Sequence, residues 1–116
     1  MHLTVRVGRE LKVVPIESVR CFLAEEKYVT ACTTEGEYVL DQSLRQLEEQ
    51  QGERFLRVHR SALVAKAAIQ GLEQDGEGRH WVRLAGGRRI EVSRRQRSRV
   101  RKWLDGIALD DRCGFV

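Results

Sequence analysis

The densest group of side chains that could do chemistry lies near the end of this sequence. Six cations fall within the nine residues 94–102, directly after Ser93, a residue type that often caps the start of a helix. The first turn of a helix has unpaired backbone amides that favour anions, so guanidinium groups placed there favour phosphate twice over. Many like charges on one helix also repel one another unless an anionic surface relieves them. The segment therefore indicates a polyanionic partner.

Two further segments carry polar groups suited to the same kind of partner. Residues 57–66 read RVHRSALVAK, and basic and hydroxyl groups on a turn suit contacts to a phosphate backbone. Residues 25–28, EEKY, predict a charged loop tip that carries an aromatic ring. Tyr28 has two interpretations: a ring that touches a base or a ribose, or a half-buried strand residue, the second being slightly favoured.

The residue spacing gives little support to catalysis or metal binding. His59 and Ser61 are two residues apart and would share one face of a strand, but the sequence has no Gly-x-Ser-x-Gly turn or comparable nucleophile context. The histidines and the three cysteines lack the ligand spacing of a zinc site. We therefore expect no enzymatic activity, no cofactor and no bound metal.

The charges divide the chain into unlike parts. Residues 1–53 hold 6 Lys/Arg against 10 Asp/Glu (net −4), residues 54–104 hold 14 against 4 (net +10), and residues 105–116 hold 1 against 3 (net −2). Arg dominates the basic part, and its planar fork of donors matches phosphate oxygens and guanine edges. A merely solvated basic face is the plainer alternative, but so many excess charges would repel one another without a counter-surface. The asymmetry is typical of a protein that binds nucleic acid.

Length and composition bound the class of protein. The chain has 116 residues, 41% hydrophobic and 33% charged, which fits one ordinary globular domain. No apolar run approaches the roughly 18–20 residues that cross a bilayer, and the start lacks the pattern of a secretion signal. The three cysteines are odd in number and form no Cys-x-x-Cys pair. We therefore expect reduced, buried thiols at Cys21 and Cys32, no membrane partner and a cytoplasmic location.

The elements that must position these groups are mostly short strands. Apolar or alternating runs bounded by turn residues predict strands at residues 3–7, 11–14, 19–24, 28–34, 38–40, 55–58, 69–73, 81–84 and 89–92. Asp41 or Ser43 caps a predicted helix over residues 44–51, and Ser93 caps a second one over residues 94–104 that Trp103 anchors on the core. Residues 63–68 are ambiguous between a strand and a helical turn.

This succession of elements predicts a single, mainly-β domain over residues 1–104. Residues 105–116 show no clear pattern. We expect them to form a C-terminal tail that is disordered.

Several blocks, taken in order, resemble the LytTR family of bacterial DNA-binding domains. They are Val19-x-x-Phe22, EKYV at residues 26–29, Leu44-x-x-Leu47-Glu48, FLRVHRS at residues 55–61 followed by Leu63-Val64, and Ile90-x-Val92 followed by SRR at residues 93–95. The resemblance covers about residues 3–104. The separation of its last two blocks is the most specific part.

The resemblance implies an elongated fold of small, mostly antiparallel sheets with one or two short helices, and double-stranded DNA as the partner. Members of the family present loops, rather than a recognition helix, to successive major grooves. They commonly bind repeated sites as pairs and usually follow a receiver domain in a two-component transcription regulator. By motif position, the implied base contacts fall on Lys27 and Tyr28, on Ala65 and Lys66, and on Arg95 beside Arg94.

The sequence departs from the common family pattern at the middle loop. Many members have Asn where this chain has Ala65, and alanine cannot make the bidentate adenine contact that Asn makes. The expected contact therefore shifts to Lys66. The positive charge alone predicts that the whole helix over residues 94–104 is a recognition element. The family resemblance implies instead that only the start of this helix contacts bases.

Three more cations complete the expected DNA-binding set as phosphate contacts: Arg60, Arg97 and Arg99. The alternative to a sequence-specific DNA-binding output domain is a basic RNA-binding or protein-interaction module, because such β domains also bind single strands or acidic surfaces.

Overall fold

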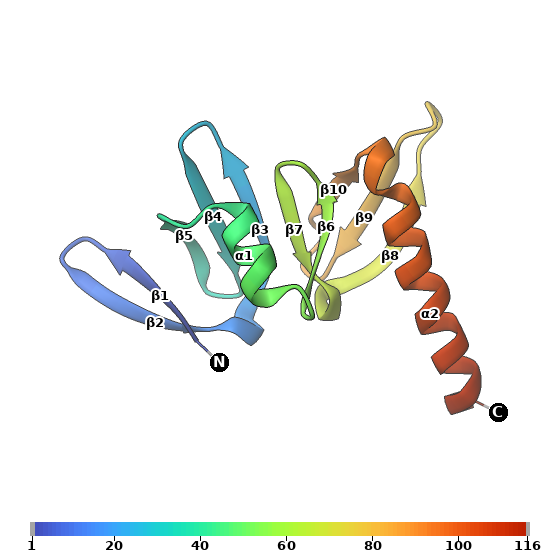
Figure 1. The fold of residues 1–116 in the computed structure, drawn as a ribbon, viewed down its shortest axis with the longest axis horizontal. Helices are drawn as coiled ribbons and strands as arrows, with labels where there is room; N and C mark the ends of the chain where they lie inside the picture. Colours follow the sequence, from blue (N-terminus) through green and yellow to red (C-terminus); the bar gives the residue numbers. More distant parts are fainter. Residues whose placement is uncertain (1, 116) are drawn as a thin grey trace.

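The computed structural model describes the backbone of residues 2–115 and the side chains of residues 2–106. Its strands form three antiparallel sheets that follow one another along a molecule of 50 × 35 × 25 Å (Figure 1). The expected mainly-β, elongated architecture is confirmed. Within the part of the chain that the structure describes, no helix is long and apolar enough to cross a membrane.

The first two sheets come from residues 2–65, slightly more than half of the chain. A two-stranded hairpin consists of β1 (His2–Val7) and β2 (Glu10–Pro15), and the single-turn 3-10 helix η1 (Ile16–Ser18) follows it. The central sheet has the strand order β5-β4-β3-β7-β6. Its strands are β3 (Val19–Glu25), β4 (Tyr28–Thr33), β5 (Gly36–Leu40), β6 (Phe55–His59) and β7 (Ala62–Ala65).

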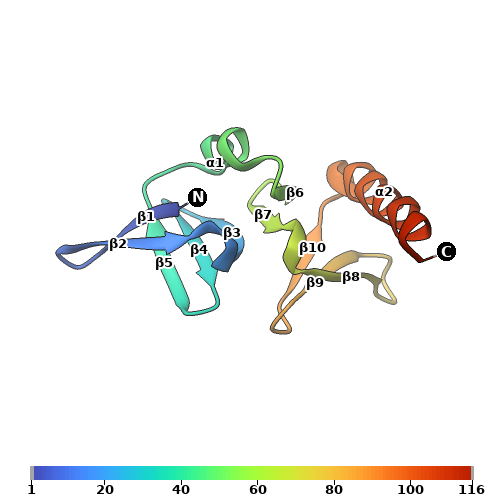
Figure 2. The same cartoon turned by 90° about the horizontal axis from the view of Figure 1, so that it is seen from below.

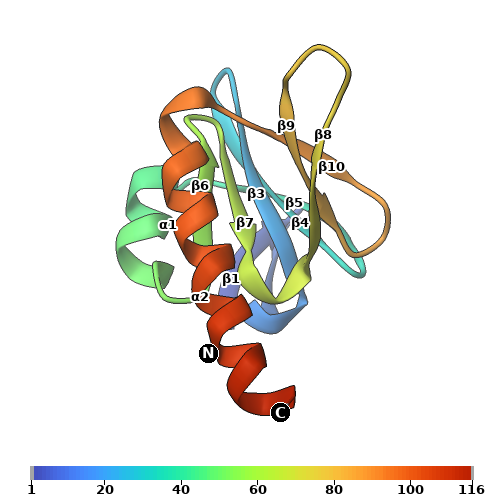
Figure 3. The ribbon, with the colours of Figure 1, turned by 90° about the vertical axis from the view of Figure 1, so that its right-hand side faces the viewer.

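The third sheet has the strand order β10-β9-β8 and follows a 3-10 turn, η2 (Lys66–Ala68). Its strands are β8 (Ile69–Gln74), β9 (His80–Leu84) and β10 (Arg89–Val92). A last 3-10 turn, η3 (Arg94–Gln96), leads into helix α2 (Arg97–Phe115). Helices α1 (Leu44–Gln51) and α2 both lie on the same side of the sheets (Figures 2 and 3).

Helix α1 confirms the predicted helix over residues 44–51, and Ser43 is its cap. The Ser43 hydroxyl accepts a hydrogen bond from the Gln46 amide (3.1 Å), and the Gln46 side chain accepts one from the Ser43 amide (2.9 Å). This reciprocal pair satisfies two donors that the first turn leaves unpaired. Leu44 and Leu47, three residues apart, are buried and fix the helix on the central sheet.

The core has two hydrophobic clusters that share the strands of the central sheet. Successive side chains of a strand point to opposite faces. In β7, Leu63 and Ala65 belong to the first cluster, whereas Ala62 and Val64 belong to the second. Because both faces of β7 are covered, all four of its residues are buried. Residues 62–65 are therefore a strand, and only residues 66–68 form the helical turn that the ambiguous segment allowed.

The end of the chain differs from expectation in its helix boundaries. Helix α2 begins at Arg97 rather than Arg94, because the SRR segment first makes the 3-10 turn η3, and the Ser93 side chain makes no capping bond. Val100 is buried in the second cluster, and Trp103, the expected anchor, packs against the same cluster while remaining half-buried. The backbone of α2 continues to Phe115, and the side chains after residue 106 lie outside the described residues, so a disordered tail at 105–116 stays a prediction.

Cys21 and Cys32 lie directly opposite one another on β3 and β4, and both are buried as free thiols. The sequence prediction of buried, unbridged cysteines is confirmed for this pair. The hydrogen bond between the two thiols raises the pKa of Cys21 and lowers that of Cys32. Cys113 lies outside the residues whose side chains the structure describes.

Candidate nucleic-acid interface

Three turns meet at one edge of the molecule, and we call this the three-turn edge. It consists of the β3–β4 turn (Glu26–Lys27), the β6–β7 turn (Arg60–Ser61) and the Ser93–Gln96 segment that contains η3 (Figure 1). Backbone hydrogen bonds tie the turns together. The Ala24 amide donates to the Ser61 carbonyl (2.8 Å), and the Ser93 amide donates to the Val58 carbonyl (2.9 Å). Segments far apart in the sequence are thus held in a fixed arrangement.

A groove of about 670 Å³ separates the second and third of these turns. Its walls come from the β6–β7 turn and from η3, and its remaining sides come from α1, β6 and the first turn of α2. The lining residues are Glu48, Arg57, His59, Arg60, Ser93, Arg94, Arg95, Gln96 and Arg99. Five of these nine side chains are guanidinium groups, so the groove is strongly cationic and suits an anion.

The cations at the tips of the three turns are free. Lys27, Arg60, Arg94 and Arg95 are exposed, and within the described part of the chain their side chains make no ion pair and no hydrogen bond. A free, hydrated guanidinium group can form new bidentate contacts without first breaking old ones. The sequence placed all four in the DNA-binding set, and the structure brings them to one edge.

Many other cations of the basic half are already neutralised. On the third sheet Arg83 and Arg89 both pair with Glu73 (2.9 and 3.3 Å), and Arg79 pairs with Asp75 and Glu77. The net charge of residues 54–104 therefore overstates the free positive charge of the third sheet. Among residues 54–104, most of the cations whose side chains make no ion pair or hydrogen bond lie at the three-turn edge instead.

The α2 cations lie differently from those of η3. Arg97 folds against the β8–β9 turn, where its Nη2 donates to the Gly78 carbonyl (3.4 Å). Arg99 lines the groove, but it pairs with Glu48 (3.2 Å). Neither predicted phosphate contact is as free as Arg94 and Arg95. The structure thus favours the start of the segment over the whole helix as the contact region, in line with the family resemblance.

Lys66 is separated from the other predicted contacts. It follows the far end of β7, where its Nζ donates to the Glu53 carbonyl (3.1 Å) and its amide donates to the Arg54 carbonyl (2.9 Å). Ala65 is buried, with only 8% of its surface exposed. The β6–β7 turn, by contrast, presents Arg60 at the three-turn edge. Lys66, the predicted middle contact, therefore lies at the opposite end of β7 from the free cations.

The β3–β4 turn carries Lys27 and Tyr28 beside a separate hollow of about 310 Å³ next to the start of α1. Tyr28 is the first residue of β4, as its interpretation as a strand residue predicted, but it is 58% exposed rather than half-buried. An exposed ring next to a turn is available to stack on a base or a ribose.

His59 and Ser61 act on each other within the β6–β7 turn. The His59 Nδ1 accepts the Ser61 amide hydrogen (3.2 Å) and lies 2.8 Å from the Ser61 hydroxyl. These contacts stabilise the turn. Among the described residues, no group of three His, Cys, Asp or Glu side chains is placed to hold a metal ion.

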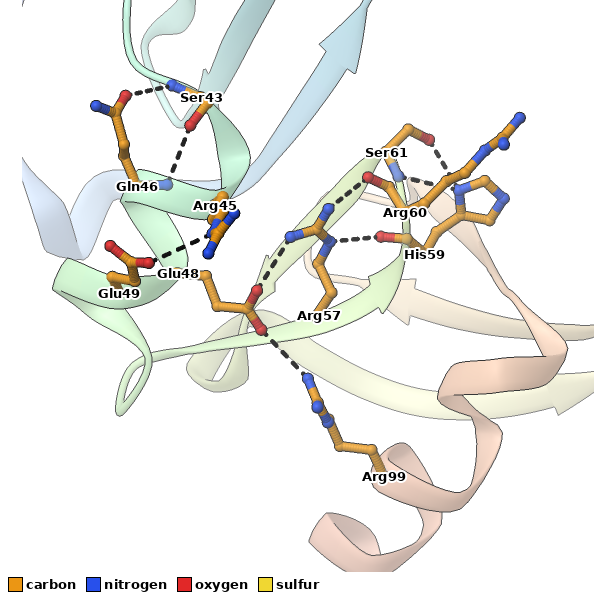
Figure 4. Close-up of polar contacts among 10 residues, drawn as sticks. All are labelled: Ser43, Arg45, Gln46, Glu48, Glu49, Arg57, His59, Arg60, Ser61 and Arg99. Atoms are coloured by element: carbon orange, nitrogen blue, oxygen red, sulfur yellow. Dashed lines mark hydrogen bonds and ion pairs between the residues drawn. The ribbon is translucent and has the colours of Figure 1, made fainter.

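Sequence reasoning missed the roles of Arg57 and Glu48. The Arg57 guanidinium donates to the His59 and Arg60 carbonyls and pairs with Glu48 of α1 (Figure 4). Arg57 stood out only as one of many basic residues, because its partner comes from another element. A paired, half-buried arginine cannot be told from a free one by composition alone.

Comparisons with known proteins bear on the family and the fold of the chain. The LytTr DNA-binding domain family matches residues 9–105. The positive alginate biosynthesis regulatory protein of Pseudomonas aeruginosa is 40% identical over 103 residues, covering 87% of this chain and 42% of that protein. This chain therefore spans less than half the length of that relative.

A solved LytTr DNA-binding domain from Bacillus cereus has a similar fold. It superimposes with a TM-score of 0.81 at 25% identity, covering 89% of this chain and 95% of that one. The family match extends over most of the sequence and includes all three turns of the three-turn edge. The chain therefore belongs to the LytTR family of DNA-binding domains.

Proposed function

We propose that this chain is the output domain of a bacterial transcription regulator of the two-component type, and that it binds double-stranded DNA in a sequence-specific manner through the three-turn edge. The observation that carries the proposal is the set of four unpaired cations at that edge, three of which line the cationic groove. By contrast, the arginines of the third sheet form ion pairs with carboxylates.

The shape of the molecule supports contact with more than one groove of the DNA. Its longest dimension is 50 Å, whereas one helical turn of DNA spans about 34–36 Å. Turns fit the major groove, which is about 12 Å wide and presents a distinct pattern for each base pair. The proposed placement directs the turns of the three-turn edge toward successive major grooves, with the β3–β4 turn at one end of the edge and the Ser93–Gln96 segment at the other (Figure 1).

Within this arrangement the contacts divide into two kinds. Arg95, Arg60 and the Lys27–Tyr28 tip are the proposed base contacts, and Arg94 is a proposed phosphate contact together with Arg99 once it leaves Glu48. Lys66 and Arg97 are left out of the set, because the side chain of each already donates to a backbone carbonyl and Lys66 also lies at the opposite end of β7. Arg60 takes the place that the sequence analysis gave to Lys66, since a guanidinium group can bind guanine through two atoms.

The wider setting is part of the same proposal. The relative from Pseudomonas aeruginosa is named as a positive regulator of alginate biosynthesis, and this chain matches 42% of its length. By analogy, we place the chain after a receiver domain in a longer regulator, acting in the cytoplasm and binding repeated DNA sites as a pair.

The decisive experiment is selection of bound sites from a pool of random duplexes, followed by titration of the selected duplex. A repeated motif should emerge. Binding should weaken steeply with salt, since phosphate contacts release counterions. Unlabelled duplex, single-stranded DNA and RNA then compete for the complex. Enrichment of no motif, or equal competition by RNA and the selected duplex, would contradict sequence-specific DNA binding.

A further inference from the structure

Arg57 occupies the base of the β6–β7 turn, and each of the three nitrogens of its guanidinium group donates a hydrogen bond within the protein. Its Nε donates to the His59 carbonyl (2.8 Å), its Nη2 donates to the Arg60 carbonyl (2.6 Å), and its Nη1 donates to Glu48 Oε1 (3.0 Å), as Figure 4 shows. The side chain is only 17% exposed. Every nitrogen of this fork is therefore already engaged within the protein.

The turn that Arg57 holds is irregular and needs this support. The pairing of β6 with β7 shifts between Arg57 and His59, which leaves the carbonyls of the turn without regular partners in the strand ladder. Arg57 supplies donors to two of these carbonyls, and the Ser61 amide is satisfied by the His59 ring. The backbone that carries the Arg60 side chain is thus fixed from both sides.

Glu48 anchors this arrangement to helix α1. One of its carboxylate oxygens binds Arg57, and the other lies 3.2 Å from Arg99 of α2. The capping box at Ser43 fixes the start of α1, and buried Leu47 fixes the face next to Glu48. The carboxylate, shared with Arg99, also offsets part of the Arg57 charge, which makes Arg57 a poorer phosphate contact than the unpaired arginines that line the same groove.

We infer that Arg57 is a positioning residue for DNA recognition: it holds the β6–β7 turn so that Arg60 enters the DNA in one orientation, and it does not contact DNA itself. The inference rests on the proposed function. Rigid support of a contacting side chain raises affinity because less conformational freedom is lost on binding. Only an arginine can do this here, because lysine carries one point charge and cannot reach two carbonyls and a carboxylate together.

The test is the variant Arg57→Lys, which keeps the charge and removes the fork. We expect affinity for the selected duplex to fall about five- to thirtyfold, while affinity for a scrambled duplex and the salt dependence stay unchanged. In the double variant Arg57→Lys, Arg60→Ala, the loss should be no larger than for Arg60→Ala alone, because Arg57 acts through Arg60. The matched control is Arg45→Lys, an exposed arginine of α1 paired only with Glu49, which should change nothing.

Each result decides between the alternatives. An equal loss on both duplexes with a weaker salt dependence would make Arg57 a phosphate contact, and additive losses in the double variant would separate it from Arg60; either overturns the inference. If Arg57→Lys melts too low to assay, Glu48→Gln replaces it, and an unchanged ratio of selected to scrambled affinity in that variant overturns the inference. Wild-type protein that prefers no duplex would instead refute the proposed function itself.

Discussion

The guanidinium groups of this chain exist in two chemical situations, and the difference sets what each can do. Arg60, Arg94 and Arg95 are free at the three-turn edge, whereas Arg57 and Arg83 are held by carboxylates or carbonyls. Exposed ion pairs add little to stability. Their main effect here is to remove free positive charge from the third sheet, next to the proposed interface.

Arg95 gives the clearest prediction for a base contact. We expect Arg95→Ala to cost about 1–3 kcal/mol of binding free energy on the selected duplex and to relax the preference at one base pair, because a bidentate contact to guanine is lost. Fluorescence anisotropy with the selected and scrambled duplexes measures both effects. Lys66→Ala is the control and should bind like wild type. A uniform loss on all duplexes would reduce Arg95 to a phosphate contact.

Asp75 predicts how stability depends on pH. The Trp81 indole donates to its carboxylate (3.0 Å), as do the Glu77 and Arg79 amides, and these bonds lower its pKa from 3.8 to about 2. The folded state therefore binds its proton less readily than the unfolded chain does. The stabilisation is complete above about pH 4 and is lost as the pH falls toward about 2.

Thermal melts between about pH 5 and pH 2 check this expectation. The wild type should lose melting temperature over this range. Asp75→Asn, which cannot ionise, should begin lower and show a shallower fall. If the melting temperatures of the two proteins fall in parallel with pH, Asp75 does not contribute to the loss of stability in acid.

At the scale of elements, helix α1 links the fold to the interface. Its capping box places Glu48 against Arg57, so a local helix signal affects a distant turn. We expect Ser43→Ala to cost about 0.5–2 kcal/mol of unfolding free energy, because the first turn loses its acceptor. Denaturant titration measures this loss. Ser98→Ala, at an exposed serine of α2, should change it by less than about 0.5 kcal/mol.

Elements with a local signal were the ones that the sequence predicted well. The helix at residues 44–51 has its own cap and two apolar residues three apart, and the strands have alternating patterns. Residues 62–65 lacked such a signal, because a strand buried on both faces has no alternation and looks like a helical segment. The start of α2 was misplaced for a related reason: a serine before arginines marks a cap, but not whether the next turn is 3-10 or α.

The candidate site was predictable only in part. Motif position and charge indicated Lys27, Arg60, Arg94 and Arg95, and these lie together. Lys66 was chosen from its place in a motif, and nothing in the sequence shows that β7 carries it to the opposite end of the sheet. The Arg57–Glu48 pair was invisible because it joins two elements whose packing is set by the core.

At the scale of the whole molecule, the alternation of β7 between the two hydrophobic clusters has a spectroscopic consequence. Both tryptophans, Trp81 and Trp103, lie in the C-terminal half, on β9 and α2, so intrinsic fluorescence observes that half alone. Circular dichroism observes all the sheets. Leu63 and Val64 are neighbours on one strand but belong to different hydrophobic clusters. The part of the molecule around one cluster therefore cannot unfold without exposing residues of the other cluster. The two signals should therefore trace a single superimposable transition, and two separated midpoints would show that the halves are independent.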